Sequence, residues 1–445
     1  MHQSPRALLR TLIAIRGAER GAVLLATAYG FCILFAYYTL RPVRDEISAE
    51  DRGNLQLLWT AVFLVMLLAV PAYSALVSRY SRRVFIPLAN RFFALNLALF
   101  FAALYLLPNE ARIWIDRVFY VWTSVFALFV VTIFWGFMAD LFRNEQGRRL
   151  FGIIAVGASL GAITGSTLTA ALAERVPTFA LLLIAMVPLE AAAWLAWGLH
   201  RNSEGLVTSL RRDTVAIKGT AFSGIGLVMR SPYLRRIAAY LALMTFASTV
   251  LYFQQADLIG TAFGDDRAAR RTVFAQIDLA VNVLTILTQL LLTAQVIRWL
   301  GVPLSLALTP ILVALGFLTL GLYPALAVLV VFQVMYRTIR YAIARPAREL
   351  LFTVVGREQR YKSKAFLDAA VYRGGDLVSG WIYAAVAALG LSVGTIALLA
   401  VPAAMLWAGV GIGVGRRQEE RARRDDDDAF DDRAPAAITP RATSL

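Results

Sequence analysis

Arginine recurs within apolar stretches of this sequence, where charged side chains are rare. Arg41 and Arg44 follow an apolar run that begins at Gly21, and Arg337 and Arg340 lie inside another. A guanidinium group at the centre of a bilayer costs about 2.5–3.5 kcal/mol on insertion scales, so it normally faces an aqueous cavity or a charged partner. Because its planar fork binds two oxygen atoms of a phosphate or carboxylate at once, these positions indicate an anion-binding site inside a membrane.

Helical spacing extends this set of candidate residues. Tyr341 follows Arg337 by four residues, so an α-helix would place it on the face that also carries Arg340. Lys364 opens a later apolar segment and adds another positive charge. The predicted substrate-binding residues are Arg41, Arg44, Arg337, Arg340, Tyr341 and Lys364.

Acidic residues among these cations are candidates for gating or coupling, because they can hold the cations in pairs while the site is empty. Arg373 precedes Asp376 by three residues, so these two could also simply neutralise each other. The predicted gating or coupling residues from this argument are Asp45, Asp140, Asp368, Arg373 and Asp376. In the alternative, structural interpretation, Arg337 pairs permanently with Asp140, Asp278 or Asp368.

The composition defines the elements that must position these residues. Of 445 residues, 59% are hydrophobic and only 16% are charged, which is typical of an all-α polytopic membrane protein. About 20 helical residues cross about 30 Å of hydrocarbon. Twelve transmembrane helices are predicted, at residues 21–46, 54–78, 84–107, 117–142, 150–173, 178–199, 236–258, 272–297, 302–322, 325–344, 365–389 and 392–414.

The longest hydrophilic stretch between these helices divides the chain into two six-helix halves. A short repeat supports the division, since Asn144-Glu145-Gln146 and Gly161 recur at one constant offset as Arg357-Glu358-Gln359 and Gly374. Such halves are familiar in secondary transporters and predict a major-facilitator-like fold. The predicted parts are an N-terminal half at 1–199, a cytoplasmic loop at 200–236, a C-terminal half at 237–415 and a disordered charged tail at 416–445.

Three glycines on the predicted fifth helix stand four residues apart, at Gly157, Gly161 and Gly165. They form one stripe without side chains, which allows the backbone of another helix to approach closely. The spacing therefore predicts a tight helix–helix contact.

Basic residues set the expected orientation, because they favour the cytoplasmic ends of short loops. Most arginines and lysines fall in alternate loops, which places both termini in the cytoplasm and, without a transit-type leader, favours a bacterial inner membrane. The exceptions, on the opposite side, are Arg41, Arg44, Arg52, Arg112, Arg117, Arg175, Arg267, Arg270 and Arg271.

The same composition argues against several function classes. The net charge of +15 is spread over alternate loops rather than gathered in one basic stripe, so a nucleic-acid partner is not expected. Cys32 is the only cysteine, and His2 and His200 are the only histidines. Disulfide frameworks, zinc sites and histidine-based catalytic triads are therefore not expected, and neither enzymatic activity nor a cofactor is predicted.

Several short segments resemble the ATP/ADP translocase family of intracellular bacteria and plastids. They are residues 41–45, 134–139, 145–151, 231–234 and 362–368. The resemblance implies a major-facilitator-like fold, counter-exchange of nucleotides and a coupling role for Glu349, which stands where the family's tenth helix ends in an acidic residue. The chain departs from the family's pattern at Arg44, where lysine is usual, and at Ser363, where glycine is expected.

The leading hypothesis is a secondary transporter of phosphorylated anions, most simply ATP/ADP exchange by alternating access within the lipid bilayer. One alternative is a proton-coupled major-facilitator-type carrier of another solute, in which the protonated residue would be Asp140, Glu190, Asp257 or Asp278. A second is a membrane partner protein that does not transport. The oligomeric state stays open, and a monomer is compatible with the sequence.

Overall fold

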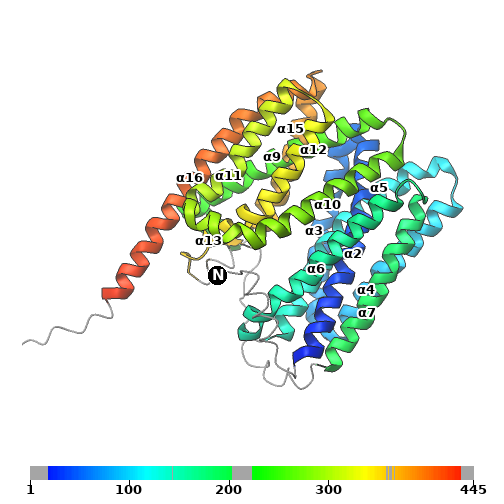
Figure 1. Cartoon of the computed structure of the whole chain (residues 1–445), viewed down its shortest axis with the longest axis horizontal. Helices are drawn as coiled ribbons and strands as arrows, with labels where there is room; N and C mark the ends of the chain where they lie inside the picture. Colours follow the sequence, from blue (N-terminus) through cyan, green and yellow to red (C-terminus); the bar gives the residue numbers. More distant parts are fainter. Residues whose placement is uncertain are drawn as a thin grey trace, which may run out of the picture.

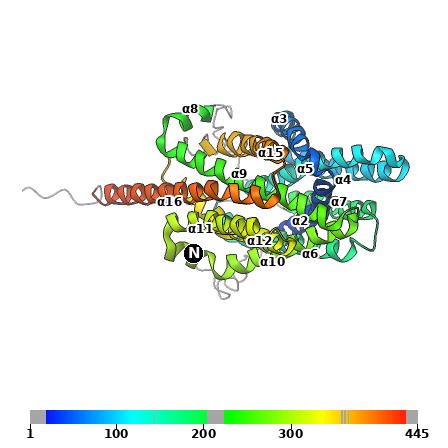
Figure 2. The same cartoon turned by 90° about the horizontal axis from the view of Figure 1, so that it is seen from above.

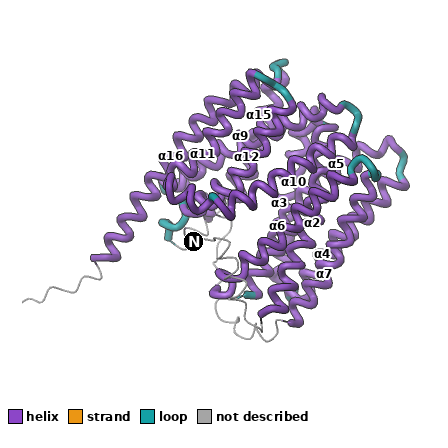
Figure 3. Tube along the Cα trace, in the orientation of Figure 1, coloured by secondary structure: helices purple, strands orange, loops and turns teal. Residues whose placement is uncertain are grey.

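The computed structural model describes residues 19–142, 144–202, 223–356, 359, 363–364 and 366–431. Within these ranges all regular structure is helical, and the long helices lie side by side in one bundle (Figures 1 and 3). The first six long helices are α2 (Arg20–Glu50), α3 (Leu55–Arg79), α4 (Arg82–Leu106), α5 (Arg112–Leu141), α6 (Asn144–Leu172) and α7 (Thr178–Asn202).

The second six spans follow the short helix α8 (Ser223–Arg230). They are α9 (Pro232–Phe263), α10 (Arg267–Leu291), α11 (Thr293–Leu322), a tenth span built from α12 (Leu326–Ile339), η4 (Arg340–Ala344) and α13 (Arg345–Leu350), an eleventh built from η5 (Leu367–Val371) and α15 (Tyr372–Ala388), and α16 (Val393–Asp431). In the part of the chain described, eleven spans are long and apolar enough to cross a membrane, and η5 with α15 supplies the twelfth. The prediction of twelve transmembrane helices is confirmed.

The helices pack mainly within two groups. In the first group α2 lies against α6 and α7, and in the second α11 and α9 lie against α16 (Figures 1 and 2). Fewer contacts join the groups, chiefly α2 and α6 with α10, and α3 with α15. We call α2 to α7 the N-half and α9 to α16 the C-half below. The division of the chain at residues 199 and 236 stays a prediction, and 203–222 lie outside the described residues.

The C-terminal tail differs from its prediction. Helix α16 continues past residue 415 to Asp431 and projects beyond the other helices in two perpendicular views (Figures 1 and 2). The first residues of the tail contact the C-half. Glu419 accepts a hydrogen bond from the backbone N–H of Val302, and Arg421 lies over the ring of Tyr233. The stretch from Arg416 to Asp431 is therefore helical rather than disordered, and residues 432–445 lie outside the described part.

The glycine stripe of α6 makes the predicted close contact. A methyl group on Gly161 would overlap the backbone carbonyl of Phe31 on α2, and one on Gly165 would come within 2.6 Å of the carbonyl oxygen of Phe35. Backbone atoms cannot move aside as a side chain can, so these glycines set the distance between α2 and α6.

Replacing Gly161 with alanine is expected to lower the unfolding free energy by about 1–3 kcal/mol, the usual cost of overpacking. Gly161→Leu should also abolish any transport by the inserted protein. Gly136→Ala on α5 is the matched control, because nothing lies within 4 Å of the added methyl group. Thermal melting of the purified variants measures the difference, and equal melting temperatures for Gly161→Ala and Gly136→Ala would contradict the tight contact.

The tenth span changes its helical geometry among the predicted site residues. From Arg340 to Ala344 the backbone is a π-helix, which holds more residues in each turn than an α-helix. The α-helical spacing that places Arg337, Arg340 and Tyr341 on one face therefore does not hold beyond Arg340. Arg337 and Arg340 instead contact different neighbouring helices.

Candidate functional site

Buried ion pairs join the two halves near the middle of the chain's long helices. Arg337 Nη2 on α12 lies 2.6 Å from Asp278 Oδ1 on α10, and Arg41 Nη1 on α2 lies 3.5 Å from the same oxygen. Asp278 is only 1% exposed. Arg41 Nε also lies 3.5 Å from Asp45 Oδ2, and Arg44 Nη2 lies 2.5 Å from Asp45 Oδ1. These five residues are called the central ion cluster below.

The charges of the central ion cluster do not cancel. Three arginines face two aspartates, so one positive charge is in excess. Arg41 Nε, Arg337 Nε and Asp278 Oδ2 are buried and make no hydrogen bond within the described chain. Because buried polar atoms are almost always satisfied, these three atoms are suited to hydrogen bonds with water or with a bound solute.

Aromatic side chains form one wall of the cluster. Tyr252 on α9 donates a hydrogen bond of 3.0 Å to Asp45 Oδ1, and its hydroxyl lies 3.2 Å from that of Tyr120 on α5. The Arg44 guanidinium lies over both rings, 5.6 Å from the centre of Tyr120 and 6.0 Å from that of Tyr252. Trp59 on α3 donates to the Tyr120 hydroxyl at 2.9 Å, so helices from both halves build this wall.

Arg340 takes part in a second group of side chains, although it lies within electrostatic range of Tyr341, as Arg337 and Arg41 do. It donates hydrogen bonds to the hydroxyls of Tyr336, at 3.0 Å, and Tyr372, at 2.5 Å. Arg373 also lies over the Tyr372 ring, with Nη1 3.9 Å from Asp376 Oδ2. Arg340, Arg373 and Asp376 therefore tie the tenth span to the eleventh within the C-half, and the predicted local pair of Arg373 with Asp376 is present.

The remaining predicted residues lie elsewhere. Lys364 Nζ is 2.5 Å from Glu349 Oε2, with both side chains about two-fifths exposed, so these two residues pair with each other away from the cluster. Asp140 is the penultimate residue of α5, about 30 Å along that helix from Tyr120, which lines the cluster, at 1.5 Å per residue. The side chain of Asp368 lies outside the described part. The structure thus brings together Arg41, Arg44, Arg337 and Asp45, with Tyr341 within electrostatic range of Arg337 and Arg41.

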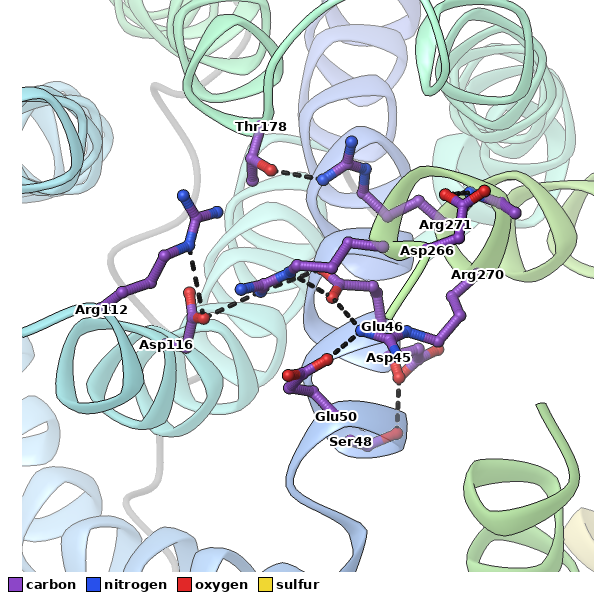
Figure 4. Close-up of polar contacts among 12 residues, drawn as sticks. Asp45, Glu46, Ser48, Glu50, Arg112, Asp116, Thr178, Asp266, Arg270 and Arg271 are labelled. Atoms are coloured by element: carbon purple, nitrogen blue, oxygen red, sulfur yellow. Dashed lines mark hydrogen bonds and ion pairs between the residues drawn. The ribbon is translucent and has the colours of Figure 1, made fainter. Parts of the chain in front are cut away.

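A network of ion pairs closes one end of the interface between the halves. Glu46 on α2 is fully buried and pairs with Arg267 at 2.7 Å and with Arg270 at 3.4 Å, both on α10. Arg267 also lies 2.8 Å from Asp116 on α5, and Arg270 contacts Glu50. Figure 4 shows Glu46, Glu50 and Arg270 pointing toward one another, with Asp116 nearby. We call Glu46, Glu50, Asp116, Arg267 and Arg270 the closing network.

Further contacts strengthen this end. Arg271 on α10 contacts Thr178 at the start of α7 and donates to the Ala173 carbonyl at 3.0 Å. Arg52 Nε lies 3.4 Å from Asp257 on α9. The halves are closest here, whereas toward the opposite end their helices lie further apart (Figure 1). The closing network therefore fastens one end of the interface.

Sequence reasoning missed Glu46, Arg267 and Arg270 as functional candidates, although a signal was present. Arg267, Arg270 and Arg52 are among the arginines predicted to lie on the side of the membrane that basic residues normally avoid. Each has an acidic partner in the structure. For these three arginines, an unexpected position in the sequence coincides with an ion pair.

A cavity of about 1230 Å³ lies between α3, α4 and α5 of the N-half. Its lining is almost wholly apolar, as at Leu57, Val65, Leu88 and Phe92, and Arg117 is the only charged residue among the described residues that line it. None of the predicted site residues lines it. The cavity suits hydrocarbon rather than a charged solute, so the central ion cluster stays the candidate site.

Comparisons with known proteins agree with this architecture. No protein-family model matches the chain, and no curated protein matches its sequence. Among solved structures, a POT family transporter in complex with 5-aminolevulinic acid matches at a TM-score of 0.64 and 10% identity, over 89% of this chain and 96% of that one. A bacterial homologue of the human lysosomal transporter Spinster, inward-facing and unoccupied, matches at 0.59 and 14% identity, over 92% and 99%.

An auto-inhibited POT family peptide transporter matches at a TM-score of 0.59 and 15% identity, over 91% of this chain and 97% of that one. Because the identities are low and the coverage is nearly complete, these matches show a shared fold. The chain has the twelve-helix fold of major-facilitator-type transporters. The fold implied by the resemblance to ATP/ADP translocases is confirmed, whereas membership of that family is not.

Proposed function

We propose that the chain is a secondary transporter of small organic solutes with at least one negatively charged group, and that the central ion cluster is its binding site. The observation that carries this proposal is a buried group of charges between the halves, with one positive charge in excess and buried Nε atoms that make no hydrogen bond. A guanidinium held in that way can bind a carboxylate or phosphate.

Alternating access around this site has a physical basis in the uneven interface. The closing network fastens one end, while the helices lie further apart at the other (Figure 1). Transport would require these ion pairs to open as contacts form at the opposite end, by rocking of one half against the other. The basic loops favour an inner membrane with both termini in the cytoplasm, which labelling of introduced cysteines from either side can test.

Asp278 is the best placed of the four acids proposed for proton coupling. Glu190 pairs with Arg91 and Asp257 with Arg52, and all four side chains are at least two-fifths exposed. Asp278 is buried and shared by Arg337 and Arg41. When a solute's anionic group takes those arginines, Asp278 loses its cations, and a buried carboxylate without a cation favours protonation.

Nucleotides suit this site less well than smaller solutes. The central ion cluster has one positive charge in excess, whereas ATP carries several negative charges. Lys364, predicted to neutralise phosphates, pairs with Glu349, and Arg340 donates hydrogen bonds to tyrosine hydroxyls. The comparisons support a transporter fold without supporting a nucleotide substrate. We therefore favour the carrier of another solute, proton-coupled through Asp278.

Uptake into proteoliposomes tests this proposal. The solutes compared are labelled ATP, ADP, inorganic phosphate, a mixture of small carboxylates and amino acids, and the neutral nucleoside adenosine. Accumulation of a singly charged or zwitterionic compound, faster with an inward proton gradient, is the expected result. Preference for adenosine would contradict the anion site, and exchange of ATP for ADP would restore the nucleotide hypothesis.

A further inference from the structure

The pair formed by Arg44 and Asp45 has an unusual geometry for a helix. Adjacent residues point about 100° apart around an α-helix and do not normally face each other. Arg44 nevertheless directs Nε, at 3.0 Å, and Nη2, at 2.5 Å, to the same oxygen of Asp45. The other oxygen of Asp45 is 3.5 Å from Arg41 Nε, which is longer than a normal hydrogen bond.

The surroundings of Arg44 form a general cation site. Asp45 supplies the negative charge, and the rings of Tyr120 and Tyr252 supply two aromatic faces. A carboxylate with aromatic faces is the chemistry that recognises ammonium and guanidinium groups. Tyr252 comes from the C-half and the other residues from the N-half, so this cation site is complete only while the halves are closed here.

We infer that Arg44 occupies this cation site only until the solute arrives, and that the transported solute is a zwitterion with a cationic group and a carboxylate. The inference rests on the proposed function. The solute's ammonium takes the place of the Arg44 guanidinium on Asp45, and Arg44 turns to the solute's carboxylate. One ion pair becomes two.

Charge pairing explains why both groups are needed. A simple anion could reach Arg44 only by leaving Asp45 without its nearest cation, and a simple amine could reach Asp45 only by releasing Arg44 unpaired. With the simple anion, Asp45 would keep only Arg41, at 3.5 Å. Weakening the compensation of a buried charge is costly, so a solute with only one of the two charged groups is disfavoured. Arg44 is 15% exposed and Asp45 is 5% exposed, so the guanidinium is the more accessible partner and can swing away.

Binding of three matched compounds to the purified protein tests the inference. They are 5-aminopentanoate, pentanoate and pentylamine, titrated while the melting temperature is followed. The zwitterion is expected to bind about tenfold more tightly than either half-match, which corresponds to about 1.4 kcal/mol. Equal affinities, or no binding by any of them, would overturn the inference, whereas the proposed function is judged separately by the uptake panel.

Two variants sharpen the test because they shift the preference in opposite directions. Asp45→Asn removes the acid that competes for Arg44, so this variant should bind pentanoate more tightly than the wild type does. Arg44→Gln removes the nearest cation from Asp45, so this variant should prefer pentylamine. Arg91→Gln, which removes an exposed pair with Glu190, is the control and should keep the wild-type order. Parallel loss of all binding in both variants would show a merely structural role for the pair.

Discussion

Replacing Arg337 with alanine is expected to lower the unfolding free energy by about 3–5 kcal/mol, the usual cost of removing one partner from a buried ion pair. Arg337 Nη2 is the nearest cation to Asp278, at 2.6 Å, and Asp278 is almost completely buried. Arg41 remains 3.5 Å from the same oxygen, so the loss should fall near the lower end of this range. Thermal or chemical unfolding of the purified variant measures it.

A second substitution separates this effect from a general loss of packing. The double variant Arg337→Leu with Asp278→Leu removes both charges and should recover most of the stability while losing solute binding, because no buried charge is stranded. Arg91→Ala, in an exposed pair, should cost at most about 1 kcal/mol. An equally small loss of unfolding free energy in Arg337→Ala and Arg91→Ala would show that the pair of Arg337 with Asp278 does not stabilise the fold. That result would contradict this account of the central ion cluster.

Replacing Glu46 with glutamine is expected to open the fastened end of the interface. Glu46 is the acid shared by Arg267 and Arg270, so its neutral analogue leaves the half-buried Arg267 and the buried Arg270 of α10 with less compensation. Ser48, fully buried one turn beyond Asp45, lies beneath this network (Figure 4). In a protein without Cys32, a cysteine at Ser48 should react with a water-soluble reagent at least about tenfold faster once Glu46→Gln is introduced.

Glu190→Gln is the matched control for this experiment, because it removes an acid of the same type from an exposed pair within the N-half. The reaction at Ser48→Cys should be unchanged in that variant. An unchanged reaction rate in Glu46→Gln as well would mean that packing, rather than the closing network, holds this end shut.

The architecture could be predicted from composition because lipid leaves few choices. Only helices and closed barrels satisfy every backbone hydrogen bond in hydrocarbon, so runs of about 20 apolar residues are a strong signal of helices. Composition defines the ends of the helices less sharply than their number. The eighth span was predicted to end at 297, whereas α10 ends at Leu291, since the sequence around Leu292 is apolar and contains neither glycine nor proline to mark the turn.

The site could be predicted only in part, because its key contacts join distant residues. Charged residues inside apolar runs pointed correctly to Arg41, Arg44, Asp45 and Arg337 as a group, although a role in binding stays a proposal. Asp278 is the partner shared by Arg41 and Arg337. This pairing depends on how α10 crosses between the halves, and the sequence indicates Asp278 only as one of several candidate acids. Lys364 was placed wrongly in the group because its partner depends on how the ends of helices pack.

The tenth span shows a different limit. Its apolar pattern predicts a regular helix, and regular spacing would put Arg337 and Arg340 on one binding face. The spacing from Arg337 to Arg340 is α-helical, yet Arg340 binds Tyr372 on α15 while Arg337 binds Asp278 on α10. The π-helix from Arg340 to Ala344 shifts only the residues that follow, and such a turn leaves little trace in hydropathy.

Initial uptake rates in proteoliposomes that contain the wild type, Arg41→Gln or Arg91→Gln test the central claim most directly. Arg41 bridges the two aspartates of the central ion cluster, whereas Arg91 lies in an exposed pair of the same half. The wild type and Arg91→Gln should take up a zwitterionic or singly anionic solute at similar rates, and Arg41→Gln should lose at least about nine-tenths of that rate, the factor for one charged hydrogen bond. Equal uptake by all three proteins, or uptake of neutral adenosine alone, would contradict an anion site at the interface between the halves.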